Sequence, residues 1–381
     1  AWPDTMPEAQ VVLKSKTETD GMGSAYTTSY KYHDGFYKYF QDYDGFAGFG
    51  EVEEINEGGP GAPTLVHRMK FDVGRDDPAF RGNLIYESNE DENGAKFWEE
   101  NTQYTKYVQH VGPDGREIKN IQPIHRTRDT YELGQGTPRR TEEEFQYDEY
   151  GNMTLDANYG VVDGTDRSAF NDETITKNLW TWNCYGWIVA DPARIDVEDL
   201  AGKRISRHEI YWDNETYLHD RFRWSITNGI TRELMFPDPY DLEHFVPVIR
   251  IKYDVSGNNG HLIDGLAVTD ADGVPDPAVG HWTVLDYEDY FQEYNTVETH
   301  HIGNGKPDLV AQYDWEYGFG APVAARDFNG FESRFKYDTF GRIVAIIRPG
   351  DTDDFPTTEY EYGLAQPFEG ALINYVEERK L

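Results

Sequence analysis

Alternation of apolar and polar residues is the dominant pattern along the chain. In the stretch 249–253 (Ile-Arg-Ile-Lys-Tyr) the apolar side chains fall on one face and the charged ones on the other, and Phe145–Tyr147 and Phe335–Tyr337 repeat this over shorter runs. Period two with aromatic and β-branched residues is typical of a half-buried β-strand. Ile343–Ile347 is apolar at every position, so we expect that strand to be covered on both faces.

Turn-forming residues separate these runs throughout the chain. Glycine and asparagine accept the positive φ that tight hairpin turns need, and the clearest turn signals are Asp34-Gly35, Asp44-Gly45, Pro113–Gly115, Gly257–Gly260 and Asp272-Gly273. The best helical spacing is i, i+3, i+4, i+7 at Tyr287, Tyr290, Phe291 and Tyr294. Tyrosine is a poor helix former, so a strand pair is the alternative there. The sequence therefore predicts an all-β fold with few helices.

Three stretches, 145–152, 251–258 and 335–342, share one pattern: an apolar residue, any residue, Tyr-Asp, two residues, Gly, then Asn or Arg. Asp suits the first position of a type I turn, and Gly three positions later closes a three-residue hairpin loop with a bulge. The Tyr ring points inward from the first strand, so we expect it to be largely buried. The repeat residues are Tyr147, Asp148, Gly151, Tyr253, Asp254, Gly257, Tyr337, Asp338 and Gly341.

Charge and composition narrow the class of protein. With 35 Lys+Arg against 70 Asp+Glu, the formal charge is −35, and such a field repels nucleic acid and anionic membrane surfaces. Low hydrophobicity would suggest disorder, but 15% of the residues are aromatic and large rings can build a core. We expect a folded chain with an acidic exterior.

Cysteine content and chain start add smaller constraints. One cysteine excludes an intramolecular disulfide and a multi-cysteine metal site. No run of eighteen apolar residues occurs, so we expect no membrane span. The sequence starts at Ala1 without Met or a signal peptide, which indicates a processed protein or a segment.

The repeat pattern resembles the YD repeat of Rhs proteins. Two other stretches, 46–53 (FAGFGEVE) and 187–194 (WIVADPAR), resemble tracts of the B components of insecticidal toxin complexes and related virulence-plasmid B-type proteins. The resemblance implies a secreted or cell-surface, non-catalytic segment of a β-sheet shell that contains, displays or attaches a toxin. Its implied partners are other segments of the same large protein, copies of itself, or toxin-complex subunits.

The chain also departs from that family. Tyr147 and Tyr253 are 106 residues apart, and Tyr253 and Tyr337 are 84 apart, so the repeats are sparse. No self-cleavage boundary is recognisable, and only the scaffold role is carried over. We divide the chain into an aromatic-rich region, 1–130, and a sparse repeat region, 131–381, with a polar linker around 128–142.

Motifs of enzymes and metal sites are few in the sequence. The motifs of serine hydrolases, P-loop proteins and zinc proteases are absent, so we expect no catalytic site and no cofactor. Asp270, Asp272 and Asp276 form a weak calcium-binding candidate, which leaves a structural Ca²⁺ open. His300 and His301 are adjacent on a predicted strand and should point to opposite faces. A carbohydrate-active or glycan-binding protein, and a cell-surface adhesin or filament subunit, remain as functional alternatives.

Overall fold

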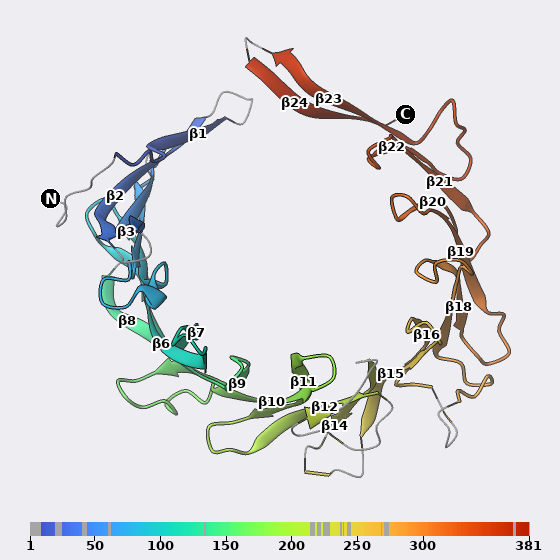
Figure 1. The fold of residues 1–381 in the computed structure, drawn as a ribbon, viewed down its shortest axis with the longest axis horizontal. Coiled ribbons are helices and arrows are strands. Elements are labelled where there is room, and N and C mark those ends of the chain that lie inside the picture. Colours follow the sequence, from blue (N-terminus) through green and yellow to red (C-terminus); the bar gives the residue numbers. More distant parts are fainter. Residues whose placement is uncertain are drawn as a thin grey trace. The chain divides into compact units, whose positions relative to one another are not determined.

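The computed structural model of the chain describes residues 9–19, 25–39, 44–59, 62–132, 135–213, 218, 222–223, 229–236, 238, 240–241, 245–267, 269, 274–368 and 371–380. Within these residues the structure is built of β-strands, with one short 3-10 turn at Pro78–Phe80 (Figure 1). The all-β prediction is therefore confirmed. In the described residues we find no helix of the length and apolarity that crossing a bilayer requires.

The chain divides into two compact units. The first comprises Ala1–Arg207 with His219–Trp224 and Asp238–Tyr240, and the second comprises His208–Leu218, Ser225–Pro237 and Asp241–Leu381. The change from one to the other falls within strand β12 (Arg204–Trp212).

The first unit is an antiparallel meander. Each of its strands pairs with the next one along the chain, from β1 to β11. A short parallel pairing joins β10 to β13 (Phe222–Arg223). The strands are β1 (Ser15–Thr19), β2 (Ala25–Tyr39), β3 (Asp44–Asn56), β4 (Leu65–Phe71), β5 (Leu84–Asp91), β6 (Lys96–Val111), β7 (Glu117–Glu132), β8 (Gln135–Tyr147), β9 (Met153–Val162), β10 (Thr174–Asn183) and β11 (Ile188–Glu198).

A small apolar cluster lies on strands β9 and β10 of the first unit. Ala157, Tyr159, Val162 and Ile175 are buried together, and Leu155 packs against them. Ile175 lies directly opposite Ala157 in the ladder. Apolar residues two apart on one strand thus meet their cross-strand partners on the same face, as period-two alternation requires.

The second unit is also an antiparallel meander. From β14 to β24 each strand pairs with its successor in the sequence. Alternate hairpin turns of such a sheet lie on the same edge. The strands are β14 (Ile230–Phe236), β15 (Val246–Tyr253), β16 (Asn259–Asp264), β17 (Trp282–Tyr287), β18 (Asn295–His301), β19 (Leu309–Glu316), β20 (Ala321–Arg326), β21 (Glu332–Tyr337), β22 (Ile343–Ile347), β23 (Thr358–Phe368) and β24 (Ala371–Lys380).

Strand β22 only partly meets the prediction that both of its faces are covered. Ala345 and Ile347 are buried, at 8% and 2% exposure, whereas Val344 and Ile346 on the other face are half-buried. The apolar run therefore has one closed face and one partly open face.

Two local predictions are wrong. The stretch around 128–142, expected to be a linker, lies mostly in strands β7 and β8, which pair with each other. The residues from Tyr287 to Tyr294, for which a helix was considered, form the end of β17 and the turn into β18, which is the strand-pair alternative. The boundary between the aromatic-rich region, 1–130, and the sparse repeat region, 131–381, separates two sequence compositions rather than two compact units. It stays a prediction.

Candidate functional site

The Tyr-Asp pattern lies at a hairpin turn in the first unit. Asp148 donates its N–H to the carbonyl of Asn152 (2.9 Å), and Gly151 donates its N–H to the carbonyl of Asp148 (3.1 Å). The Asp148 carboxylate accepts the N–H groups of Tyr150 and Asn152, both at 2.9 Å. Gly151 has φ +89°, in the left-handed region, and a bulge precedes Tyr147. This is the three-residue loop that the spacing predicts.

The other two Tyr-Asp patterns form the same turn in the second unit. The Asp254 carboxylate accepts the N–H groups of Ser256 (2.8 Å) and Asn258 (2.9 Å). Asp338 does the same in its own turn. The glycines three positions later have φ of +90° at Gly257 and +76° at Gly341. The geometry of the pattern is thus common to all three turns, while its role as a repeat module stays a prediction.

The three tyrosines are less buried than expected. Tyr147, Tyr253 and Tyr337 are each half-buried, because each stands at the end of its strand, beside the turn. Two of the hydroxyls reach the neighbouring strand: Tyr253 donates to the carbonyl of Ile230 and Tyr337 to that of Pro322, both at 2.8 Å. The rings therefore act as ties between strands as well as packing groups.

The same tie recurs at positions that the sequence pattern missed. Tyr287 donates to the carbonyl of Asn259 (3.4 Å), Trp315 Nε1 to that of Asn295 (2.7 Å), and Tyr362 to that of Ile343 (2.9 Å). Each of these three acceptors is the first residue of its strand, as Ile230 is, and Pro322 is the second residue of β20. From β15 to β23, each odd-numbered strand is thus fastened to the strand before it by an aromatic donor.

An acidic residue follows two of these aromatic residues. The Glu288 carboxylate accepts the N–H groups of Tyr290 (2.6 Å) and Phe291 (2.7 Å), and the Glu316 carboxylate accepts that of Phe319 (2.8 Å). Two further turns between Tyr253 and Tyr337 thus have a glutamate that caps backbone N–H groups after an aromatic residue, while the spacing of the repeats stays a prediction. The signal that could have found them is an aromatic residue followed by any acidic residue, not Tyr-Asp alone.

Further turns keep the Asp and Gly but lack the tyrosine. Their first N–H and fifth carbonyl are hydrogen-bonded, their carboxylate accepts backbone N–H groups, and their glycine has positive φ. The Asp and Gly residues are Asp91 and Gly94, Asp199 and Gly202, and Asp327 and Gly330. The spacing Asp-x-x-Gly by itself marks these turns, because the short aspartate side chain places one carboxylate oxygen within reach of both free N–H groups.

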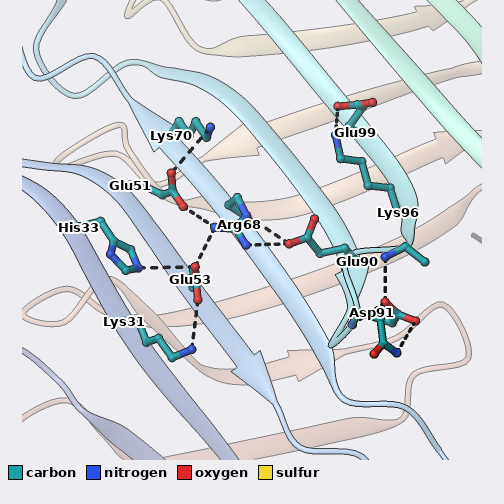
Figure 2. A network of polar contacts seen from close by, with 12 residues as sticks. Lys31, His33, Glu51, Glu53, Arg68, Lys70, Glu90, Asp91, Lys96 and Glu99 are labelled. Carbon is teal, nitrogen blue, oxygen red and sulfur yellow. Dashed lines mark hydrogen bonds and ion pairs between the residues drawn. The ribbon is translucent and has the colours of Figure 1, made fainter. Parts of the chain in front are cut away.

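Ion pairs cross the strands of the first unit. Arg68 on β4 lies at the centre of the network in Figure 2, where its guanidinium contacts Glu51, Glu53 (2.7 Å) and Glu90 (2.8 Å). Burial raises the pKa of the Glu53 carboxyl, but the charge and hydrogen bond of Arg68, together with the charges of Lys31 and His33, outweigh burial and the pKa lies below its usual value. Lys31, His33 and Lys70 lie around the same carboxylates.

A second network has the opposite arrangement, with one carboxylate among several arginines. Asp196 pairs with Arg207 through two hydrogen bonds of 2.7 and 2.9 Å, and with Arg194 (3.0 Å) and Arg204 (3.3 Å). Asp196 is 4% exposed and Arg207 is 7% exposed. Burial raises the pKa of Asp196, yet the hydrogen bonds and charge of Arg207 bring it below its usual value.

Two groups of side chains have the donor types of a metal site: His33 with Glu51 and Glu53, and His125 with Glu142 and Glu144. In the first, the Arg68 guanidinium bridges both carboxylates. In the second, Arg167 bridges them at 2.5 and 2.6 Å. A cation already neutralises each set, so the geometry fits an ion-pair network.

Of the three aspartates that form the calcium-binding candidate, only Asp276 lies in the part of the chain that the structure describes. Asp270 and Asp272 lie outside the described residues. The Asp276 carboxylate accepts the N–H of Ala278 at 2.8 Å, which makes it a turn-stabilising group.

The adjacent histidines point to opposite faces, as predicted. His300 hydrogen-bonds Thr283 (2.9 Å), whereas His301 stacks on Trp282 with ring centroids 3.8 Å apart. His261 lies 5.5 Å from the same indole, so Trp282 has ring neighbours on two strands. One face of the half-buried Trp282 ring is thus taken up by His301.

The first 64 residues resemble a toxin family in sequence. Residues 1–64 match the family described as the middle/N-terminal region of the insecticide toxin TcdB. Among curated proteins, none matches the chain significantly.

Solved structures resemble the chain in fold. The crystal structure of TcdB2-TccC3 matches with a TM-score of 0.63 and 10% identity, over 89% of this chain and 24% of that chain. The crystal structure of TcdB2-TccC3-Cdc42 gives 0.62 and 10%, over 89% and 23%. The Photorhabdus luminescens Tc holotoxin pore gives 0.59 and 11%, over 85% and 21%. At such identity the likeness is one of fold, and this chain spans about a quarter of those chains. In fold over most of its length, and in sequence over residues 1–64, the chain resembles the B components of insecticidal toxin complexes.

Proposed function

We propose that the chain is a non-catalytic structural segment of a longer secreted protein of the YD-repeat kind. In this role its sheets form part of a shell or scaffold that contains, displays or attaches a toxin or partner. The observation that carries the proposal is the uninterrupted antiparallel meander in each unit, together with the fold likeness to TcdB2-TccC3 over 89% of the chain.

The construction of the turns supports a scaffold role. Six turns close with their own aspartate and glycine, and in the second unit an aromatic donor ties each odd-numbered strand from β15 to β23 to the strand before it. Such modules extend a sheet by repetition, because each hairpin needs only its neighbours. Stability rather than reactivity is the property that these contacts serve.

The partners that we propose are further repeats of the same longer chain, copies of this chain, or toxin-complex subunits. Strand β24 pairs with β23, and its residues 374–380 are all exposed. An exposed strand can pair through its backbone with a strand of another segment or another copy.

Sedimentation velocity of the purified chain at micromolar concentration tests the proposal. We expect assemblies heavier than the 43.9 kDa chain, and we expect the double variant Tyr375→Lys, Val376→Lys on β24 to lose them. The matched control places two lysines elsewhere, at Val108 and Ile118, which are also exposed. A monomer that hydrolyses glycans, and loses that activity when one carboxylate pair is neutralised, would instead support the carbohydrate-active alternative. Regular filaments would support the adhesin.

A further inference from the structure

Exposed aromatic side chains gather on one edge of the second unit. They lie in the turns β17–β18, β19–β20 and β21–β22, which share an edge of the meander. Tyr290 is 83% exposed and Phe340 76%, and Phe291, Tyr317 and Phe319 are each exposed by about half. We call Tyr290, Phe291, Tyr317, Phe319 and Phe340 the aromatic turn edge. Rings of this size exposed together mark an interaction surface more often than chance.

The aromatic turn edge is continuous from turn to turn. Phe291 contacts Tyr290 with ring centroids 4.6 Å apart and Tyr317 at 5.5 Å. The ring of Phe319 lies against Gly341, where a β-carbon would come within 2.9 Å of it, and Gly341 is next to Phe340. The surface therefore spans three hairpins instead of forming three isolated patches.

The turns hold these rings in place. The carboxylates of Glu288, Glu316 and Asp338 accept backbone N–H groups of the residues that carry the rings, at 2.6–2.8 Å. A surface fixed before binding loses less conformational entropy when a partner docks.

Acidic groups flank the rings. Residues 288–294 contain Glu288, Asp289 and Glu293, and residues 316–320 contain Glu316, with no lysine or arginine in either turn. The turn of Phe340 adds Asp338 and one cation, Arg342. The edge thus combines exposed rings with a net negative charge, which favours a cationic partner.

The chain itself shows what such a combination binds. In the turn of Phe340, Arg342 pairs with the Asp338 carboxylate at 2.6 Å and lies over the Phe340 ring at 5.2 Å and the Tyr362 ring at 4.3 Å. Elsewhere Arg167 lies 4.0 Å from the ring centroid of Tyr159 while it pairs with Glu142 and Glu144. The turns of Glu288 and Glu316 offer the carboxylates and the rings but contribute no arginine of their own.

We propose that the aromatic turn edge docks a basic, arginine-containing segment of a partner protein. Its guanidinium groups lie on the exposed rings and pair with the flanking carboxylates, as Arg342 does within the chain. This surface is made of hairpin tips, and it does not depend on the scaffold role proposed above.

Fluorescence anisotropy with a labelled ten-residue peptide of alternating arginine and leucine tests this docking. We expect the triple variant Tyr290→Ser, Phe291→Ser, Phe340→Ser to bind at least about tenfold more weakly than the native chain. The matched control is Phe328→Ser, Phe331→Ser, Phe355→Ser, which removes three exposed rings from the opposite edge of the same unit and should bind within about twofold of native. A lysine-leucine peptide should bind more weakly than the arginine one, because a guanidinium stacks better on rings.

Several results would overturn the proposal. Weakening in neither triple variant would mean that net charge alone attracts the peptide. Equal weakening in both would mean that exposed rings on either edge bind it without preference. Equal binding of a glutamate-leucine peptide would mean that the rings bind apolar peptides without regard to charge. Absence of binding of the arginine-leucine peptide to the native chain would also refute docking. Thermal melting checks the fold of each variant. Should the triple variant not fold, Phe340→Ser is compared with Phe355→Ser, because these two rings are 76% and 74% exposed.

Discussion

At the scale of single residues, each hairpin depends on two polar atoms more than on a large core. A turn carboxylate satisfies backbone N–H groups inside the loop, as Asp338 does for Phe340 and Arg342. An aromatic hydroxyl satisfies a carbonyl at the start of the preceding strand, as Tyr337 does for Pro322. Backbone groups at the ends of strands would otherwise depend on water, so these two contacts satisfy groups at the strand ends where they occur.

Removal of one hydroxyl should be measurable. Tyr337→Phe leaves the Pro322 carbonyl without its donor, and we expect a loss of about 1 kcal/mol in the free energy of unfolding by denaturant. Tyr337→Ala should cost about 2–3 kcal/mol, less than the loss typical of a fully buried ring, because the side chain is half-buried. The control is Tyr290→Phe, in a side chain 83% exposed, which should change nothing. A loss below about 0.5 kcal/mol for Tyr337→Phe would contradict the tie between strands.

The Asp196 network predicts a dependence on pH. Because the folded pKa of Asp196 lies below its unfolded value, ionised Asp196 stabilises the fold above about pH 4, and this contribution is lost as the pH falls through the folded pKa. Asp196→Asn should therefore reduce the fall in the free energy of unfolding between neutral and acid pH. It should also cost about 3–5 kcal/mol at pH 7, because Arg207 stays buried.

The control for this measurement is Asp289→Asn, an exposed aspartate in a turn. Chemical denaturation from pH 7 to pH 2 should give parallel curves for this variant and the native chain. If Asp196→Asn also runs parallel to the native chain, the carboxylate does not supply the acid-labile stability.

At the scale of elements, the sequence predicts a hairpin correctly where the turn follows the Asp and Gly spacing. The prediction misses a hairpin where a different sequence forms the turn. The turns at Tyr147, Tyr253 and Tyr337 follow from Asp and Gly spacing, because turn geometry needs only five consecutive residues. The turns after Tyr287 and Trp315 have Glu in place of Asp. The longer side chain reaches a different set of N–H groups, including the one three residues on, and a motif written with Asp does not detect it. The polar composition around 128–142 resembled a linker, yet cross-strand ion pairs such as Arg140 with Asp129 stabilise it as a hairpin.

The altered turn at Glu288 can be tested by hydrogen exchange. Glu288→Ala removes the acceptor of the Tyr290 and Phe291 N–H groups, so both amides should exchange about tenfold faster. Glu293→Ala changes an exposed glutamate in the same turn and should leave both rates unchanged. Unaltered exchange in Glu288→Ala would show that this turn does not share the capping of the Tyr-Asp turns.

At the scale of the whole molecule, repulsion among the excess carboxylates opposes the stabilisation that the ion-pair networks provide. The chain carries a formal charge of −35, and cations such as Arg68 and Arg167 each pair with more than one carboxylate. Repulsion among the remaining carboxylates acts over the whole surface and is screened by salt within about a Debye length. Partly buried pairs are screened much less.

Salt should therefore stabilise the chain. We expect the melting temperature to rise as NaCl is increased from about 0.05 M to about 1 M, since the Debye length shortens from over 10 Å to about 3 Å. Sodium sulfate is compared at equal ionic strength, because sulfate also strengthens apolar burial. A melting temperature that falls with NaCl would mean that attractive ion pairs outweigh the net charge.

The pairing of each strand from β14 to β24 with its sequence neighbour has a consequence for how the second unit can change in length. Because the direction of the chain reverses at each turn, the insertion of one strand would transfer all later turns to the opposite edge of the sheet. The aromatic turn edge would then split between two sides. Insertion of two strands, one whole hairpin, leaves every later turn where it was. Only the insertion or loss of an even number of strands therefore keeps each turn on its own edge of the sheet. Growth or shortening by whole hairpins meets this condition.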